Sequence, residues 1–302
     1  DTERQVGVVA LWNSIRGMMT ADLHVHTHFS DGTDTPEELF AAAQAAGLTT
    51  LGLTDHDTSK GWEPVAAAVP AGMRVLPGAE FSTKHPAADG SLVSVHLLGY
   101  LFDPASPAIV AEWQRMKDDR RLRGERIVEK LIAADYTIDL ARVREIAGPS
   151  NIGRPHIARA LVEAGVISTV GEAFSGLLDD DGDFYVALRS TTLLEGITMI
   201  SEAGGVPVVA HPRARAAAEV LTAEVLEELA DRGLQGIEVR HPDHDDAARA
   251  ELGGIATDLR LLQTGSSDYH GGNKTLVIGQ ERTSDDVVDA IIERGAVAPF
   301  VG

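Results

Sequence analysis

Short apolar segments alternate with amphipathic ones through the first hundred residues and again after residue 190. In the first part, strands are predicted over residues 21–26, 50–54, 74–79 and 92–98. A helix is predicted between the first two strands, with Asp34 or Thr35 as its N-cap and Gly47 just past its end. Because apolar strands that alternate with helices are typical of a parallel sheet or barrel, the predicted fold class is α/β.

Residues 107–189 show a different pattern. A long, charged, helical periodicity runs from Ile109 to Asp135, and an acidic stretch over 179–183 closes the region. Further helices are predicted there over 140–147, 154–164 and 169–177. The strand–helix alternation then resumes, with strands over 206–210, 236–240 and 260–264 and a last helix over 285–295. We therefore predict an N-terminal extension over 1–21, a barrel formed by 22–106 and 190–302, and a small helical insertion over 107–189.

Composition narrows the classes of function. The chain has 302 residues, of which 44% are hydrophobic and 24% are charged, as is usual for a globular protein. Its net charge of −20 disfavours binding to duplex nucleic acid or to an anionic membrane. Since no segment reaches the roughly 18 apolar residues of a membrane span and the apolar run Val6–Trp12 lacks a basic opening, we expect a cytoplasmic protein. The oligomeric state is left open.

Histidines gather where the predicted strands end. The chain has 11 His and no Cys, so any metal ion must bind to imidazoles and carboxylates. Residues i and i+2 of a strand point to the same face, which makes pairs of His24 with His26 and of Asp268 with His270. Seven histidines and three acids occupy such positions: His24, His26, His56, His96, His211, His241, His270, Asp31, Glu80 and Asp268.

The whole set carries more weight than any single motif. A lone His-x-His is more often a turn or surface feature than a metal site, and we expect His28, His85 and His244, which lack a strand context, to be solvated. However, active sites of α/β barrels lie at the carboxyl ends of the strands, where these groups would converge. Imidazole and carboxylate donors without thiolates suit Mn, Fe or Zn in a catalytic site.

Several motifs in chain order resemble the polymerase and histidinol phosphatase (PHP) superfamily. The similarity spans residues 22–302 and is carried by Asp22–Gly32, Thr54–Thr58, Gly78–Ser82, Ala210–Pro212 and Ser267–Gly271. Asn151–His156, within the helical insertion, resembles the stand-alone branch of the family. Members of that branch act on small nucleotides such as nucleoside 3′,5′-bisphosphates, or trim short oligoribonucleotides from the 5′ end.

The resemblance implies a distorted seven-stranded (β/α) barrel with two or three divalent metal ions at its mouth. One metal ion would be held by His24, His26, Glu80 and Asp268. A second would be held by Asp31, His56 and His270, and a third by His96 and His211 with Glu80 bridging. His241 falls outside this ligand set and is expected to contact the phosphate or to donate a proton.

The expected reaction is hydrolysis of a phosphate ester by a hydroxide that bridges two metal ions, with Asp31, Glu80 and His241 in the catalytic centre. The three carboxylates of the site carry three negative charges, which two or three divalent ions outweigh. The pocket can therefore bind a phosphorylated substrate, such as AMP or a bisphosphate, although the protein surface is acidic.

Arg154 and His156 are candidates for holding a second phosphate, since a guanidinium suits bidentate phosphate contacts. The alternative is that both have structural roles at a helix start. Arg120–Arg123 is interpreted as a solvated helix face. Aromatic residues make up only 5% of the chain, which disfavours an extended base-stacking track.

Two other functions remain open. A metal-dependent amidohydrolase or deaminase also begins with His-x-His, but usually needs a bridging lysine, whereas Glu80 occupies that position here and Lys84 is expected in a loop. The second is a non-catalytic, metal-bearing accessory domain, which has no need of a complete ligand set. Asp55 and Asp57, on either side of His56, are candidates for orienting its imidazole.

Overall fold

The computed structural model describes residues 19–148, 150–179 and 182–302. They divide into two compact units: the described residues up to Ile109 with Ser190–Gly302 form unit 1, and the described residues of Val110–Arg189 form unit 2. Most of the expected N-terminal extension, including Val6–Trp12, lies outside the described residues. None of the helices in the described part of the chain is long and apolar enough to cross a membrane.

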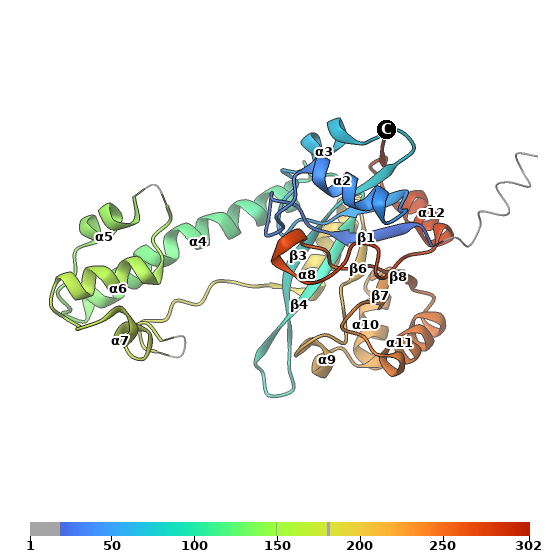
Figure 1. Ribbon diagram of the computed structural model, residues 1–302. Helices are drawn as coiled ribbons and strands as arrows, with labels where there is room; N and C mark the ends of the chain where they lie inside the picture. Colours follow the sequence, from blue (N-terminus) through green and yellow to red (C-terminus); the bar gives the residue numbers. More distant parts are fainter. Residues whose placement is uncertain (1–18, 149, 180–181) are drawn as a thin grey trace, which may run out of the picture. The chain divides into compact units, whose positions relative to one another are not determined.

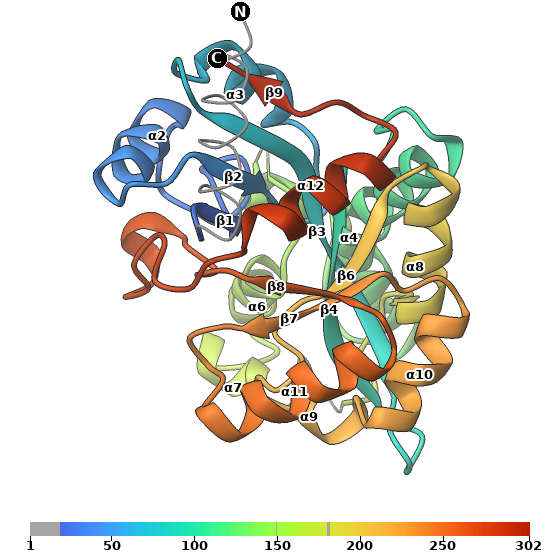
Figure 2. The same cartoon turned by 90° about the vertical axis from the view of Figure 1, so that its right-hand side faces the viewer.

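Unit 1 is built on a curved, nearly closed sheet (Figures 1 and 2). Seven strands form one path, which confirms the expected α/β barrel. In path order they are β1 (Ala21–Val25), β2 (Thr50–Leu53), β3 (Arg74–Pro86), β4 (Leu92–Tyr100), β6 (Val206–Val209), β7 (Gly236–Arg240) and β8 (Leu262–Gly265). The short strands β5 (Thr191–Thr192) and β9 (Phe300–Val301) pair with β3.

The parallel pattern expected from the sequence breaks at β4, which is antiparallel to both β3 and β6. The predicted third strand ends at residue 79, but β3 continues to Pro86 and turns back into β4. In the turn, the Ala87 N–H donates to the Ser91 carbonyl at 2.8 Å. A turn this short joins only antiparallel strands, because a parallel crossover needs about a dozen residues or more. Lys84 consequently lies in β3 rather than in a loop.

The two ends of the sheet meet through the segment that follows β8. Val25 forms a parallel bridge with Tyr269, and the His26 N–H donates to the Tyr269 carbonyl at 2.8 Å. Ser267 donates to the buried carboxylate of Asp22 from its N–H at 3.0 Å and from its hydroxyl at 2.5 Å. These bonds bring the end of β1 and the loop after β8 to the same rim of the barrel.

Helices cover the outside of the sheet in unit 1 (Figure 2). α8 packs on β3, β4 and β6, and α11 packs on β7 and β8. Thr35 and Glu38 form a reciprocal capping box at the start of α2, as expected for Thr35 as the N-cap. The helices of this unit are α2 (Pro36–Ala45), α3 (Trp62–Ala68), α8 (Leu193–Glu202), α9 (Ala217–Val220), α10 (Ala223–Asp231), α11 (Asp246–Asp258), α12 (Asp285–Arg294) and the 3-10 helix η1 (Gly271–Asn273).

Unit 2 is helical and has an apolar core of its own. Its helices are α4, which begins in unit 1 (Pro107–Ala133), α5 (Leu140–Ala147), α6 (Arg154–Glu163) and α7 (Val170–Phe174). Ile127, Leu131, Ile157 and Leu161 are among the buried residues of this core. At Gly124 a Cβ atom would lie 2.2 Å from the Ile152 carbonyl oxygen, so glycine lets α4 and this loop approach closely.

Candidate metal centre

Nine imidazole and carboxylate side chains converge at the carboxyl ends of the parallel strands of unit 1. They come from β1, β3 and β4 and from the loops after β1, β2, β6 and β8. Although up to 246 positions separate them along the chain, they form one group around a single carboxylate. We refer to them as the Glu80 cluster: His24, His26, Asp31, His56, Glu80, His96, His211, Asp268 and His270.

Glu80 lies at the centre of this cluster with 1% of its side chain exposed. Its Oε2 is 3.0 Å from Nε2 of both His24 and His26 and 3.4 Å from Nε2 of His56. Its other oxygen, Oε1, lies 2.6 Å from His96 Nδ1 and 3.2 Å from His211 Nε2. One carboxylate thus faces imidazoles from β1, β4 and the loops after β1, β2 and β6, as a bridging ligand requires.

Three subsets of the cluster place one donor atom per residue within 4.8 Å of one another. They are His24, His26, Glu80 and Asp268; then His26, Asp31, His56 and His270; and last His56, Glu80 and His96. His211 joins the cluster through Glu80, outside these three subsets. Such mixed nitrogen and oxygen donors suit Zn²⁺, Mn²⁺ and Fe²⁺.

Unpartnered nitrogens also fit bound cations. Within the described residues, His26 Nδ1, His56 Nδ1 and His270 Nε2 are buried and have no hydrogen-bond partner. Buried polar atoms in folded proteins nearly always have a partner, so each such atom requires an explanation. A metal ion bound between His270 and Asp31, whose Oδ2 lies 3.3 Å from His270 Nε2, would supply the missing partner of that nitrogen. In His26 and His56 the nitrogen that faces Glu80 is Nε2 rather than Nδ1.

The charges of the cluster also favour the binding of cations. Burial opposes ionisation of Glu80, yet the imidazoles of His24 and His96 hold the pKa of this carboxyl well below its usual range. Burial likewise opposes ionisation of Asp268, but the His24 imidazole lowers the pKa of that carboxyl. Conversely, Glu80 and Glu238 outweigh burial and raise the pKa of His24 well above its ordinary value. Because the acids are anionic and His24 holds an extra proton, binding of cations would release protons.

The backbone departs from ordinary conformations beside the cluster. His211 and Asp268, at the ends of different strands, have φ values of 28° and 54°. Residues other than glycine rarely adopt positive φ, and where they do the surrounding structure holds them there, often at functional sites. Gly271 (φ 63°) follows, and a Cβ at this position would lie 2.1 Å from Thr33 Oγ1. The loop after β8 is therefore held closely against the loop after β1.

Comparison with known proteins identifies the fold. Residues 22–170 match the PHP domain. A phosphoribosyl 1,2-cyclic phosphate 1,2-diphosphodiesterase from Eggerthella lenta is 31% identical over 84% of this chain and 95% of its own length. This chain belongs to the PHP family.

Other relatives of this PHP chain carry related names. A 3′,5′-nucleoside bisphosphate phosphatase from Chromobacterium violaceum is 33% identical over 84% of this chain and 88% of its own length. A 5′-3′ exoribonuclease from Haemophilus influenzae is 29% identical, with coverages of 90% and 96%. The PHP chain is therefore a hydrolase of phosphate esters, as expected from the motifs, and the reading as a non-catalytic domain is not supported.

Solved structures agree with this family. A protein from Bifidobacterium adolescentis, named as a metal-dependent phosphoesterase, superposes with a TM-score of 0.66 at 35% identity and covers 93% of this chain and 98% of its own. A Chromobacterium violaceum protein named as an amidohydrolase gives a TM-score of 0.60 at 29% identity, with coverages of 89% and 93%. The PHP chain thus belongs to a family of metal-dependent phosphoesterases.

Side chains behind the cluster hold its loops in place. The Asp55 carboxylate accepts bonds from the Thr27 N–H at 2.8 Å and from the Ser30 hydroxyl at 2.7 Å. Asp57 accepts from the N–H and hydroxyl of Ser82 at 2.9 and 2.8 Å. These bonds order the loop after β1 and the middle of β3. That either acid orients the His56 imidazole stays a prediction.

Two residues that sequence reasoning did not single out belong to this region. Glu238, fully buried in β7, lies 3.1 Å from His24 Nδ1 and accepts a bond from the His211 N–H at 2.7 Å. Lys274 places its Nζ 2.7 Å from Asp268 Oδ2. A charge in the middle of a strand covered on both faces is a signal that could have revealed Glu238. Lys274 follows η1 and shows no comparable pattern.

His241 lies beside the Glu80 cluster and is 1% exposed. Its Nδ1 accepts a bond from the Asp243 N–H at 3.1 Å, so its Nε2 carries the proton of the neutral ring. That Nε2 has no hydrogen-bond partner among the described residues and lies 3.9 Å from Asp268 Oδ2. Burial, although opposed by Glu238, lowers the pKa of His241 to about 4. His241 is therefore a neutral donor facing the cluster.

The three histidines expected to be solvated differ from one another. His28 is exposed, and His85 is half-buried on β3. His244 is 2% exposed, so the expectation is wrong for this residue. The turn after β7 folds its ring inward, where Nδ1 lies 3.0 Å from the Val239 carbonyl and Nε2 accepts from the Arg213 N–H at 3.2 Å.

Arg154 and His156 lie at the start of α6 in unit 2. Arg154 donates to the Leu178 carbonyl at 3.1 Å, and its guanidinium lies over the Phe174 ring at 5.5 Å. His156 accepts a bond from the Gly153 N–H through Nδ1 at 3.0 Å and so helps to cap the helix. Both residues therefore have local roles in unit 2, and their contact with substrate stays a prediction.

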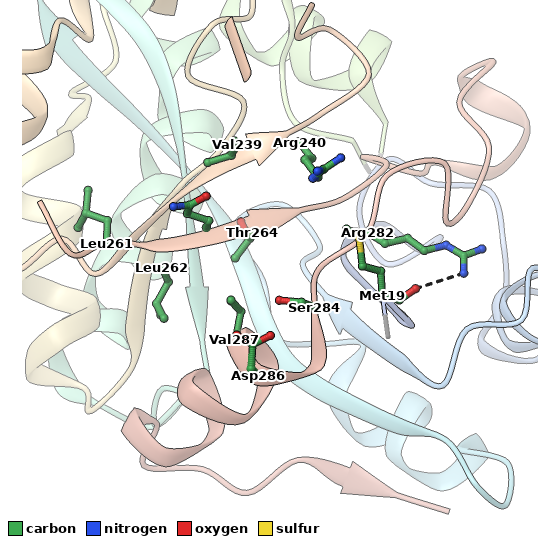
Figure 3. A pocket seen from close by; sticks show the side chains of 11 residues that line it. Met19, Val239, Arg240, Leu261, Leu262, Thr264, Arg282, Ser284, Asp286 and Val287 are labelled. Carbon is green, nitrogen blue, oxygen red and sulfur yellow. Dashed lines mark hydrogen bonds between the residues drawn. The ribbon is translucent and has the colours of Figure 1, made fainter. Parts of the chain in front are cut away.

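A separate pocket of about 430 Å³ lies beside β7, β8 and the start of α12 (Figure 3). Val239, Leu262 and Val287 supply apolar walls, and Arg282 donates to the Met19 carbonyl at 3.3 Å at one side. The pocket contains no member of the Glu80 cluster. This pocket is therefore separate from the converging imidazoles and carboxylates.

Proposed function

We propose that this PHP enzyme hydrolyses a phosphate ester of a small nucleotide, either a nucleoside 3′,5′-bisphosphate or the 5′ end of a short oligoribonucleotide. The observation that carries the proposal is the placement of five imidazoles around the two oxygens of Glu80. The names of two relatives, a bisphosphate phosphatase and an exoribonuclease, support the choice of substrate.

The donor set fits two or three divalent ions of Mn, Fe or Zn. One ion would be held by His24, His26, Glu80 and Asp268. A second would be held by Asp31, His56 and His270, and a third by His96 and His211 with Glu80 shared. When bound, such ions lower the pKa of water and stabilise the negative charge that develops on phosphoryl oxygens.

The charges of the site support a phosphorylated substrate. Asp31, Glu80 and Asp268 contribute three negative charges, and Glu238 adds a fourth because the His24 imidazole, outweighing burial, lowers its pKa to about 2. Lys274 offsets one of these charges. Two or three divalent ions would therefore make the site positive against a protein surface of net charge −20, and the metal-free enzyme would bind phosphate poorly.

His241 and Lys274 supply hydrogen-bond donors on one side of the cluster. His241 Nε2 and Lys274 Nζ both face Asp268 Oδ2, at 3.9 and 2.7 Å. We assign both to the oxygens of the substrate phosphate, where an N–H and an ammonium stabilise negative charge. The low pKa of His241 favours this contact over proton donation, because the neutral ring has no acidic proton to give up near pH 7.

We also propose that residues 107–189, which include unit 2, are a subdomain inserted into the barrel. Its proposed role is to recognise the part of the substrate other than the phosphate that is hydrolysed. Arg154 is assigned to a second phosphate, since its planar fork suits a phosphate group, and His156 is placed beside it on α6. The Phe174 ring, 37% exposed and next to the Arg154 guanidinium, adds an apolar surface at this position.

A substrate panel tests the proposal. The protein, loaded in turn with Mn²⁺, Fe²⁺ or Zn²⁺, would be incubated with adenosine 3′,5′-bisphosphate, AMP, a 5′-phosphorylated RNA trimer, a ribose cyclic phosphate and a set of amides. We expect turnover of the bisphosphate or the trimer and none of the amides. Faster hydrolysis of an amide would favour the amidohydrolase alternative, and preference for the cyclic phosphate would refute the nucleotide assignment.

A further inference from the structure

One buried carboxylate on β7 contacts two members of the Glu80 cluster at atoms other than those that face Glu80. Glu238 has no exposed surface. Its Oε1 lies 3.1 Å from His24 Nδ1 and accepts the Ser266 hydroxyl, and its Oε2 accepts the His211 N–H at 2.7 Å. Glu238 thereby joins the end of β1, the loop after β6 and the loop after β8.

The three partners of Glu238 are all donors. The Ser266 hydroxyl and the His211 N–H donate to it, so the anionic carboxylate requires a proton on His24 Nδ1 as well. Consequently Nε2 is the nitrogen of His24 that can give up its proton to a cation. This Nε2 faces Glu80 Oε2 at 3.0 Å and Asp268 Oδ1 at 3.4 Å.

We propose that Glu238 is a positioning residue, which keeps the proton of His24 on Nδ1 and anchors the backbone of His211 so that both rings present Nε2 to Glu80. This inference rests on the proposed function, because it assumes that the imidazoles of His24 and His211 bind metal ions. The unusual φ of 28° at His211 agrees with it, because a backbone held in this region needs a strong local contact.

A carboxylate is required at this position for a geometric reason. In Glu238→Gln the side chain keeps its shape but has one oxygen and one NH₂ group. If the oxygen faces His24 and Ser266, the NH₂ group meets the His211 N–H, donor against donor. If the amide is flipped, the NH₂ group meets His24 Nδ1 and forces the proton onto Nε2, the atom that would bind the metal ion. Either orientation breaks one contact.

Zinc affinity of the purified protein tests the proposal. Removing a carboxylate that orients a ligating histidine typically weakens metal binding about 10- to 100-fold. We expect Glu238→Gln to raise the Zn²⁺ dissociation constant by that factor in competition with a chelator. Ser266→Ala is the matched control, since Ser266 is equally buried and bonds the same Glu238 oxygen but is not a member of the Glu80 cluster. Equal weakening in both variants would overturn the positioning role.

A second measurement needs no variant, in case Glu238→Gln fails to fold. Nitrogen-15 NMR of histidine-labelled, Zn²⁺-loaded wild-type protein should show His24 protonated on Nδ1 with the metal ion on Nε2. The reverse assignment would overturn the proposal. Neither measurement involves a substrate, so a protein that binds Zn²⁺ as expected but leaves nucleotides intact would refute the proposed function and leave the role of Glu238 standing.

Discussion

Replacing Glu80 by Gln removes the charge at the centre of the cluster and keeps the shape of the side chain. The carboxylate faces five imidazole nitrogens at 2.6 to 3.4 Å, so the substitution affects every proposed metal position that shares it. At an effective dielectric constant of about 20, a unit charge and a divalent ion about 4 Å apart interact by about 8 kcal/mol.

The net loss is smaller, because the amide dipole and the remaining ligands compensate in part. Loss of an indirect, orienting partner already weakens metal binding about 10- to 100-fold. We therefore expect Glu80→Gln to weaken binding of the shared ions by at least about 1,000-fold, or about 4 kcal/mol. An equal or larger fall is expected in kcat/KM, since the chemistry needs the bound ions.

The assay combines metal content, measured by mass spectrometry after desalting, with phosphate release from adenosine 3′,5′-bisphosphate. Glu251→Gln is the matched control, because Glu251 also bonds a basic side chain, Arg213 at 2.8 Å, but lies on the exposed face of α11. Thermal unfolding in the presence of chelator shows whether each variant folds. A folded Glu80→Gln protein with wild-type metal content and turnover would refute the bridging role.

Three further predictions concern substrate, protons and metal. Arg154→Ala should raise KM about tenfold for a nucleoside bisphosphate and less for a monophosphate, as steady-state kinetics would show; equal changes would remove Arg154 from the second-phosphate site. Because the pKa of His241 falls from 6.5 to about 4 on folding, the unfolded chain binds more protons between these values. Metal-free protein should therefore lose up to about 3 kcal/mol of stability from this residue as pH drops through that range. Urea unfolding of His241→Gln as a function of pH should not show the part of the stability loss that comes from His241. A pH dependence of stability equal to that of the wild-type protein would contradict this prediction. Chelation should abolish turnover, and added Mn²⁺ should restore it; persistent activity without metal would exclude the mechanism.

Much of unit 1 could be predicted because its signals are local. Apolar runs bounded by turn residues mark the strands, and the predicted strand over 236–240 coincides with β7. The caps of α2 depend on neighbouring residues such as Thr35 and Glu38. Since parallel strands bring their carboxyl ends to one rim, the placement of His24 and Asp268 near each other follows from the alternation itself.

Features that depend on contacts between distant parts of the chain could not be predicted from local sequence signals. The direction of β4 depends on how far β3 extends. A strand that ends at residue 79 leaves about a dozen residues for a parallel crossover, whereas β3 runs to Pro86 and turns directly into β4. The burial of His244 depends on how the turn after β7 packs. The position of Glu238 in a covered strand marks it as unusual, but its partners, which come from β1 and from the loops after β6 and β8, could not be predicted from that position.

Anomalous X-ray diffraction from crystals grown with Mn²⁺ tests the central claim most directly. We expect two or three strong peaks inside the Glu80 cluster, at least two of them in contact with the Glu80 carboxylate and one also with His24. Fully occupied Mn²⁺ sites elsewhere on the protein, with no Mn²⁺ between Glu80 and its imidazoles, would contradict the claim that this cluster binds metal ions.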